Sequence, residues 1–472
     1  MRRIYTIIAL IIFILLLAVG LDRNYTILNY FSPLKVKNIE LFNLPENRLR
    51  FKVNVTANRK FSAYIKYWAV NSKDTLYTEV TEQNNPNTIT LINTVANTAY
   101  KFQVVAVEGR HVSLSKVHDF RTKPIYQATP YFDLVKMDPS ISKEIGNKYF
   151  LTQILTQPGS MVVINAKGDI VWYQPFKKGV KVSHWTKHQT ILSIVGAESI
   201  PSSGGDEIVE VNLKGEEVRH LTTGKGGLDK MVHHEVRYDA DGNIYALTFD
   251  KKVADLRKAG GLEKDTIHGD GIIVLDKAGK KIWEWSVIDH LDPFKDPLIL
   301  KHKKDWVHAN ALFKDKDGNF IISYRDLNQI WKVEYKTGKV LWKLGDNGDF
   351  PLKENEHFSS QHSAHINASG DLMILDNGTK TGISRAMSFQ LNPLRKTAVT
   401  KFIIPLSHDY YTTAKGNTAL FGKDKVLFCL TDSRSFLVTD KAGKILWEMK
   451  VGGDPYRLEE VTDFILPKPI RQ

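Results

Sequence analysis

Hydrophobic and polar side chains alternate with a period of two along most of the chain after its apolar start. Residues 49–55 show this alternation clearly, and residues 99–107 show it again. The stretches between such runs are short and contain Gly, Asn and Asp, the residue types that favour tight turns. No long segment has the 3.6-residue period of an amphipathic helix. The pattern therefore predicts an all-β protein.

The first group of alternating segments lies between residues 32 and 124. Strands are predicted over 49–55, 63–70 and 99–107, and roughly seven strands in about 90 residues is a density typical of a β-sandwich. Trp68, together with the alternation of Tyr100, Phe102 and Val104, resembles the core of a fibronectin type III module. Trp68 is therefore predicted to be a core residue. This likeness concerns fold alone and implies no chemistry.

A different repeat occupies residues 145–472. Its unit is a turn that ends in Gly followed by a strand that contains Trp, as in 336–342. Six copies recur at spacings of roughly 50 to 60 residues, which is the period of a propeller blade. Four copies keep both residues, one keeps only the Gly and one has neither. They lie at 166–172, 213–218, 278–283, 336–342, near 391–394, and at 441–447. We therefore predict a six-bladed β-propeller over 145–472.

Histidines recur at one corner of this repeat. One predicted blade has strands over 308–313, 319–324, 329–335 and 339–344, and His308 opens its inner strand. His234 and His362 open the corresponding strands of two other blades. Inner strands run in one direction around a propeller axis, so their first residues meet on one face. The same face is predicted to hold Asn310, Arg325, Asn377, Arg385 and, from the loop that enters the last blade, His408.

The choice among neighbouring histidines rests on register. Counted back from the turn glycine, His234 and His362 occupy matching places, which favours His234 over His233. His365 lies three residues after His362 and is predicted to point to the opposite face of the sheet.

Three imidazoles and a guanidinium indicate a particular chemistry. Neutral imidazole is a nucleophile and an acid–base group near neutral pH, and Arg binds tetrahedral oxyanions. Together they favour transfer of a phosphoryl or sulfuryl group through a covalent histidine adduct. No Gly-rich phosphate cradle is present, so a nucleotide donor is not indicated. Three imidazoles also suit zinc or copper; the arginine argues against a metal, and we predict none.

Charge and the N-terminal segment bear on partners and location. The net charge is +13, but the lysines are dispersed in turns such as 277–281 and 441–444, so no basic stripe predicts nucleic-acid binding. Residues 1–22 form a basic start followed by an apolar run, which predicts a signal peptide or signal anchor. The remainder is then exported, either periplasmic or anchored in the inner membrane and facing the periplasm. Cys429 is the single cysteine, so no intramolecular disulfide forms.

At its histidine motifs the chain resembles the bacterial arylsulfotransferases, which use no nucleotide sulfate donor. The resemblance implies ping-pong transfer, without a cofactor, from a phenolic sulfate ester to a phenolic acceptor. His362 would be the nucleophile. His234, His308, Asn310 and Arg325 would hold the sulfuryl oxygens, and His234 or His308 would also handle the phenolic proton. The motifs that carry the resemblance are 233–235, 305–310, 323–325, 361–362 and 376–378, and Asn377 and His408 complete the predicted substrate-binding set.

The chain departs from this family at Ser363, where members commonly have Asp, and in lacking a disulfide. Two other interpretations stay open. The repeated element also resembles the tryptophan motifs of quinoprotein propellers, although those have eight copies as a rule and an acidic rather than a histidine-rich channel. A non-catalytic scaffold anchored at the membrane is the other alternative. The sequence leaves homodimer formation undecided.

Overall fold

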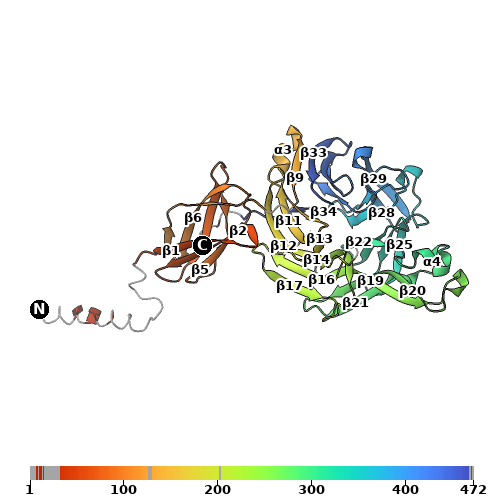
Figure 1. Ribbon diagram of the computed structural model, residues 1–472, viewed down its shortest axis with the longest axis horizontal. Coiled ribbons are helices and arrows are strands. Elements are labelled where there is room, and N and C mark those ends of the chain that lie inside the picture. The colour runs from red at the N-terminus through yellow and green to blue at the C-terminus, as the bar shows by residue number, and fades with distance from the viewer. Residues whose placement is uncertain are drawn as a thin grey trace. The chain divides into compact units, whose positions relative to one another are not determined.

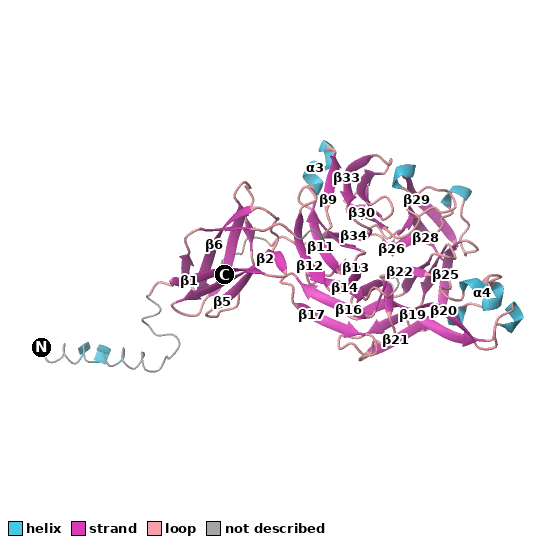
Figure 2. Cartoon of the chain, viewed as in Figure 1, coloured by secondary structure: helices cyan, strands magenta, loops and turns pink. Residues whose placement is uncertain are grey.

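The computed structural model describes residues 7–8, 10–12, 14, 32–125, 130–200, 203–466 and 469. The chain folds into two compact units, one with the described residues up to Pro124 and from Ile465, the other with those of Ile125–Phe464. Both consist mainly of strands, and the helices are short (Figure 2), so the chain is all-β as predicted. Most of the leader predicted over 1–22 lies outside the described residues. Within the described part, no helix combines the length and apolarity needed to cross a bilayer.

The N-terminal unit has two antiparallel sheets that share one hydrophobic core. Alternate residues of the central strands point into this core, including Val53, Ile65 and Phe102. The sequence predicted these three strands because each has the period-two pattern. One sheet has the order β1 (Val36–Leu44), β2 (Asn47–Ala57), β5 (Asn87–Leu91). The other has the order β4 (Leu76–Tyr77), β3 (Ser62–Ala69), β6 (Ala99–Glu108), β7 (His111–Leu114), and β8 (His118–Arg121) also pairs with β6.

The prediction that Trp68 is a core residue was wrong by one position. Tyr67 is the buried residue, with 1 % of its surface exposed, and its hydroxyl donates to the Ile92 carbonyl at 2.6 Å. Trp68 is only partly buried and pairs across the strand with Lys101. Ile65 fixes the inward register of β3, so the period of two places residue 67 inward and residue 68 outward.

The second unit contains six antiparallel sheets among its described residues (Figure 1). Each has four or five strands, and most sheets use strands that follow one another in the chain. In sheet order, the first three are β12 (Ile170–Phe176), β11 (Gly159–Asn165), β10 (Tyr149–Ile154), β34 (Pro455–Val461); β13 (Gly179–Trp185), β14 (Thr190–Gly196), β16 (Glu207–Asn212), β17 (Glu217–Thr222); and β15 (Gly204–Gly205), β18 (Val232–Tyr238), β19 (Ile244–Ala254), β20 (Asp265–Leu275), β21 (Lys281–Ser286).

The other three sheets continue the pattern along the chain. The blade parsed from the sequence is one of them, and its strands lie where they were predicted. These sheets are β22 (Ala309–Lys314), β23 (Phe320–Tyr324), β24 (Gln329–Val333), β25 (Val340–Gly345); β26 (His362–Ile366), β27 (Leu372–Asp376), β28 (Arg385–Asn392), β29 (Thr397–Pro405); and β30 (Asn417–Phe421), β31 (Lys425–Leu430), β32 (Ser435–Asp440), β33 (Ile445–Val451), β9 (Phe132–Met137). Short helices α3 (Pro139–Ile145) and α4 (Ile299–His302) lie in connecting segments.

Strands from the two ends of this unit share sheets. The C-terminal β34 pairs with β10, and the N-terminal β9 pairs with β33. One strand of each sheet, at its edge or, for β18, next to the short edge strand β15, also lies against its counterpart in the next sheet, in the cycle β34, β13, β18, β22, β26, β30 and back to β34. These six strands are here called the inner strands; β34, β13, β22, β26 and β30 lie near the middle of the unit in Figure 2, with β17, β21 and β29 outside them. The first residues of the inner strands carry the predicted histidines.

The repeated tryptophans link neighbouring sheets. Trp447 on β33 donates its indole N–H to the Ala166 carbonyl at 2.9 Å, in the turn before β12. Trp172 on β12 does the same to the Leu213 carbonyl at 2.8 Å. A buried indole N–H needs a partner, and the turn of the next sheet supplies it. Two of the four repeat tryptophans therefore mark places where one sheet is bonded to the next.

Candidate functional site

The three predicted histidines lie where inner strands begin, and each adjoins an irregularity in strand pairing. His234 is in β18, His308 immediately precedes β22, and His362 opens β26. The register shifts fall at 233/236, 309/311 and 362/365. His234, His308 and Ser363 also have positive φ angles of 56°, 50° and 61°. β-bulges re-aim side chains and cluster near active sites, and non-glycine residues in this backbone region are strained unless their surroundings hold them.

The structure brings these residues together from different sheets. The rings of His234 and His308 are 5.0 Å apart and nearly perpendicular. Arg325 donates from Nη1 to Nε2 of His308 at 3.1 Å. Burial is the main reason that the pKa of His234 lies well below its usual value, and the neighbouring His233, His308 and His362 contribute. The three histidines and Arg325 therefore form one cluster.

His362 is held as a neutral imidazole with a defined tautomer. Its Nδ1 lies 2.8 Å from Oδ1 of Asn377 and 3.0 Å from the Ser360 carbonyl, and both oxygens accept only. The proton is therefore on Nδ1 and the lone pair on Nε2, which accepts the Lys415 backbone N–H at 3.1 Å. Burial, followed by the charge of Arg457, holds the pKa of His362 well below its usual range. Nε2 is thus a free-base nitrogen at neutral pH.

Two hydrogen bonds, one to Asp305 and one from Arg325, orient the His308 ring. Its Nδ1 donates to Oδ2 of Asp305 at 2.6 Å, so Nε2 accepts from Arg325. Burial alone would raise the pKa of the Asp305 carboxyl, but the hydrogen bond from His308 lowers it. Arg325 is also bound by Asp326, at 2.6 Å through Nε and 3.2 Å through Nη2. The arginine is therefore held in place at the cluster.

Arg457 on β34 was missed by the sequence analysis. It is 4 % exposed, donates from Nη2 to the Asn310 carbonyl at 3.1 Å and from Nη1 to the Gly416 carbonyl, and lies over the Tyr456 ring. No carboxylate forms an ion pair with it within the described chain. A buried guanidinium without a counter-ion favours binding of an anion. The available signal was an Arg in the apolar start of the last strand, but its partners come from distant sheets.

Asn310 and Asn377 are both fully buried at the cluster. Asn310 donates from Nδ2 to the Gln361 carbonyl at 2.8 Å, which ties β22 to the start of β26. Asn377 donates from Nδ2 to the carbonyls of Thr412 and Lys415, each at 3.1 Å. The two amides therefore fix the backbone around His362.

Two predicted rim residues make no contact with the cluster in the described chain. His408 is exposed in a one-turn helix (His408–Tyr410), with its ring 5.9 Å from that of Tyr411, and no contact in the described chain joins it to the cluster. Arg385 is bound by Asp376, with 2.9 Å between Nε and Oδ2, and by the His357 carbonyl at 2.7 Å. Arg385 therefore acts as a structural clamp, because its donors are already occupied.

A second group of charges lies further along the inner strands, and the sequence analysis did not identify it. His184 contacts Glu235 at 2.5 Å and Glu459 at 3.2 Å, and Arg237 donates to Glu235 at 3.0 Å. Burial and Arg237 disfavour the charged imidazole, yet the two carboxylates outweigh them and raise the pKa of His184. Among the described residues, no cluster of three or more His, Cys, Asp or Glu side chains is arranged to hold a metal ion.

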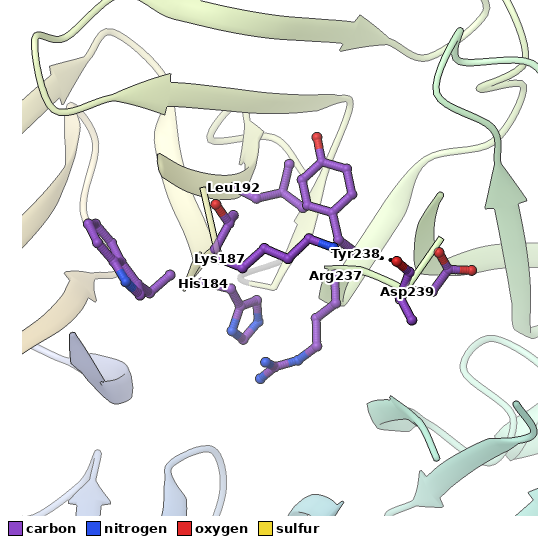
Figure 3. Close-up of a pocket in the computed structure, with 9 residues that line it drawn as sticks. His184, Lys187, Leu192, Arg237, Tyr238 and Asp239 are labelled. Carbon is purple, nitrogen blue, oxygen red and sulfur yellow. Dashed lines mark hydrogen bonds between the residues drawn. The ribbon is translucent and has the colours of Figure 1, made fainter. Parts of the chain in front are cut away.

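Two cavities adjoin this group. One of about 180 Å³ is lined by His365, Arg457 and Thr418 among others. The other, of about 270 Å³, lies at the ends of β13 and β18. Figure 3 shows His184 and Arg237 extending to the same side of this second cavity, while Lys187 reaches toward Tyr238 and Asp239. These cavities lie beyond the histidine cluster along the inner strands.

Solved structures give only distant likenesses. A protein of unknown function from Bacteroides caccae is 11 % identical, with a TM-score of 0.44 over 67 % of this chain and 99 % of that one. Virginiamycin B lyase from Staphylococcus aureus is 9 % identical, with a TM-score of 0.34 over 69 % of this chain and 99 % of that one. Such scores are too low to support an argument about fold or function.

Comparison with curated proteins gives no match. The family model described as Arylsulfotransferase (ASST) matches residues 135–431, which is more than half of the chain and contains the whole histidine cluster. This chain therefore belongs to the arylsulfotransferase family.

Proposed function

We propose that the protein transfers a sulfuryl group from a phenolic sulfate ester to a phenolic acceptor, with His362 as the covalent carrier. Family membership supports aryl sulfotransferase activity in general. The single observation that carries the mechanism is the state of His362. Asn377 occupies Nδ1, burial keeps the ring neutral, and the lone pair stays on Nε2, where the Lys415 backbone N–H donates to it until sulfur takes that place. A fixed, unprotonated imidazole is what attack on sulfur requires.

Fixed cations near the nucleophile support the same reaction. The sulfuryl group is anionic, and negative charge spreads over its oxygens during transfer. Arg325 and the buried Arg457 are two guanidinium groups available to that charge, and preorganised donors are the largest contribution in many such reactions. His234 and His308 bear lone pairs and protons suited to the phenolic oxygen. No nucleotide and no metal has a role in this scheme.

We propose a six-bladed β-propeller as the scaffold. Six sheets, an unbroken cycle of packing between inner strands, and sheets shared by β34 and β9 support this architecture. The N-terminal unit is proposed as a fibronectin-III-like sandwich. Export to the periplasm, with or without retention at the inner membrane, follows from the apolar N-terminal segment and is likewise a proposal.

The test is a burst experiment. Purified protein is mixed with a chromogenic aryl sulfate, first without acceptor and then with an added phenol. We expect about one equivalent of phenol to be released at once, slow release afterwards, and fast turnover when the acceptor is present. The adduct should map to the peptide with His362, provided that acid is avoided during the digest because a sulfuryl–imidazole bond is acid-labile.

His362→Asn provides the decisive variant. It should abolish the burst while the far-UV circular dichroism spectrum stays unchanged. A full burst in this variant would transfer the nucleophile role to another histidine. The absence of a burst from the wild type with a range of aryl sulfates would favour the non-catalytic scaffold instead.

A further inference from the structure

His234 is joined to a buried carboxylate through His233. Nδ1 of His233 lies 2.7 Å from Nδ1 of His234. On its other side, Nε2 of His233 lies 3.3 Å from Oδ1 of Asp270, in an ion-pair contact without well-aligned hydrogen-bond geometry. His233, His234 and Asp270 are 1 %, 5 % and 3 % exposed, so no solvent separates them. They form a buried line of three titratable groups that ends at the active-site cluster.

The short Nδ1–Nδ1 distance couples the tautomers of the two rings. Burial lowers the pKa of both imidazoles, that of His233 to about 3, so both are neutral at neutral pH. A neutral imidazole has one N–H and one lone pair. Two neutral rings that meet through Nδ1 can share only one proton there. If His233 accepts at Nδ1, His234 has its lone pair on Nε2; if His233 donates, His234 has its proton on Nε2.

Asp270 decides between these two arrangements. A carboxylate accepts a hydrogen bond from Nε2–H of His233, so His233 accepts at Nδ1 and His234 has its lone pair on Nε2. A protonated carboxyl donates to Nε2 of His233, which places the proton of His234 on Nε2. In either case Nε2 of His234 faces the Ser203 hydroxyl at 3.0 Å, a group that donates or accepts equally well.

We propose that Asp270, His233 and His234 form a proton relay that switches Nε2 of His234 between donor and acceptor in the two halves of the proposed sulfuryl transfer. In the first half, Nε2 of His362 attacks sulfur and the S–O bond to the phenol breaks. Nε2–H of His234 protonates the departing oxygen, Nδ1–H of His233 passes to His234, and the Asp270 proton passes to His233. The products are a free phenol, sulfo-His362 and an Asp270 carboxylate.

The second half reverses each transfer. The acceptor phenol gives its proton to Nε2 of His234, its oxygen attacks sulfur, and the bond from sulfur to Nε2 of His362 breaks. The relay proton returns to Asp270. Each half therefore prepares the state that the other half needs, and no proton is exchanged with solvent over one turnover.

The surroundings suit a carboxyl that gains and loses a proton. Burial raises the pKa of Asp270 well above its ordinary value, with contributions from nearby acids. At the other end of the relay, burial, with smaller contributions from the neighbouring histidines and Arg457, lowers the pKa of His234. The Thr248 carbonyl raises the pKa of His233, against the larger effect of burial. The titratable and charged groups that face the relay are Asp250, Asp305, Asp326, Tyr324, His308, His362 and Arg457.

Asp270→Asn tests the relay because the structure fixes which way the new amide faces. Oδ2 of Asp270 accepts the Ala309 backbone N–H at 2.7 Å. The amide oxygen must keep that position, so the NH₂ group faces His233. That group only donates, so His233 accepts at Nε2 and donates at Nδ1. His234 is then locked with its proton on Nε2 and is no longer a base.

Two measurements on the full chain follow. With 4-nitrophenyl sulfate, whose leaving group needs no acid, the burst of Asp270→Asn should stay close to that of the wild type. Transfer to a phenol should fall by roughly 10²-fold, the contribution of a general base, and fall further as the phenol becomes less acidic. Asp265→Asn is the matched control: it removes another buried carboxylate of β20, which binds Lys303 instead of a histidine, and it should leave both steps unchanged.

The second measurement does not depend on activity. Nitrogen-15 NMR of labelled histidines reports which ring nitrogen bears the proton. In the wild type, His234 should change from Nε2–H to a lone pair on Nε2 as pH rises and Asp270 ionises. In Asp270→Asn the proton of His234 should remain on Nε2 at every pH.

An unchanged tautomer in the wild type, or equal loss of both chemical steps in Asp270→Asn, would overturn the relay. A wild type without a burst would overturn the proposed function, and the NMR result would still decide the relay. If Asp270→Asn does not fold, His233→Gln, which cannot pass the proton, should show the same selective loss of the acceptor step.

Discussion

Nδ1 of His362 lies 2.8 Å from Oδ1 of Asn377, at the junction between the start of one strand and the end of its hairpin partner. The contact sets both the tautomer and the direction of the ring. Antiparallel hairpin strands bring the first residue of one strand beside the last residue of the other. His362 and Asn377 therefore meet, and Asn377 orients the imidazole. Asn377 is in turn fixed by two carbonyls of the 412–415 segment.

Asn377→Ala should slow the burst without moving the adduct. The ring of His362 keeps the Ser360 carbonyl at Nδ1 but loses its main side-chain anchor, and misplacement of about 1 Å can cost roughly 10²-fold in rate. Rapid-mixing measurement of phenol release gives the rate, and peptide mapping gives the site. Asn367→Ala is the control, because Asn367 caps the turn at the other end of the same hairpin. An Asn377→Ala burst as fast as that of the wild type would contradict the orienting role.

Arg457→Met should slow the burst by roughly 10²- to 10³-fold, the usual effect of removing one donor to a developing oxyanion. Arg457→Lys should lose less, because it keeps the charge but not the planar pair of donors. The same loss of positive charge should raise the pKa of His362, which NMR titration can follow. Arg434→Met removes an arginine that is 58 % exposed and should have no effect on the burst. Equal burst rates for Arg457→Met and the wild type would remove Arg457 from the site.

Tyr67→Ala should destabilise the N-terminal unit far more than Trp68→Ala. Truncating a fully buried aromatic side chain costs about 3–5 kcal/mol, whereas Trp68 lies in the partly exposed register. Chemical denaturation followed by circular dichroism measures both, because Trp68 is the single tryptophan of the N-terminal unit and its replacement removes the fluorescence reporter there. A larger loss from Trp68→Ala would mean that the register of β3 differs from the one described.

The sequence predicted what depends on local pattern. Alternation located β2, β3 and β6, and the Gly–Trp repeat located outer strands, since both reflect periodicities of a single strand or turn. The sequence analysis assigned the core position to Trp68 instead of Tyr67 because two adjacent aromatic residues fit either register. The burial of Ile65 distinguishes the two registers only once the strand is placed in its sheet. The histidines were identified because equivalent strand starts recur in the repeat.

Residues that depend on closure of the chain were not predictable in this way. Arg457 reaches the site because β34 pairs with β10 across most of the sequence. Asp270 lies on β20, which is separated from the β18 strand of His233 by β19 in the same sheet. His408 was placed on the rim by its position in the loop that enters the last blade, and such a position does not determine where a side chain points.

The pH dependence of stability separates two kinds of buried histidine. The pKa of His184 is raised by Glu235 and Glu459. Its contribution to stability is therefore fully present below its ordinary value of 6.5 and is lost as pH rises through the folded-state pKa. The pKa of His233 is lowered to about 3 by burial. The neutral ring is compatible with the fold above pH 6.5, and stability is lost as pH falls from there toward 3.

Thermal melting of His184→Gln and His233→Gln beside the wild type, at a series of pH values, measures both effects. The deficit of His184→Gln should be greatest at acidic pH and shrink as pH rises. The deficit of His233→Gln should shrink as pH falls, because the variant has no imidazole to protonate. Parallel curves for the two variants would contradict the opposite directions of these pKa shifts.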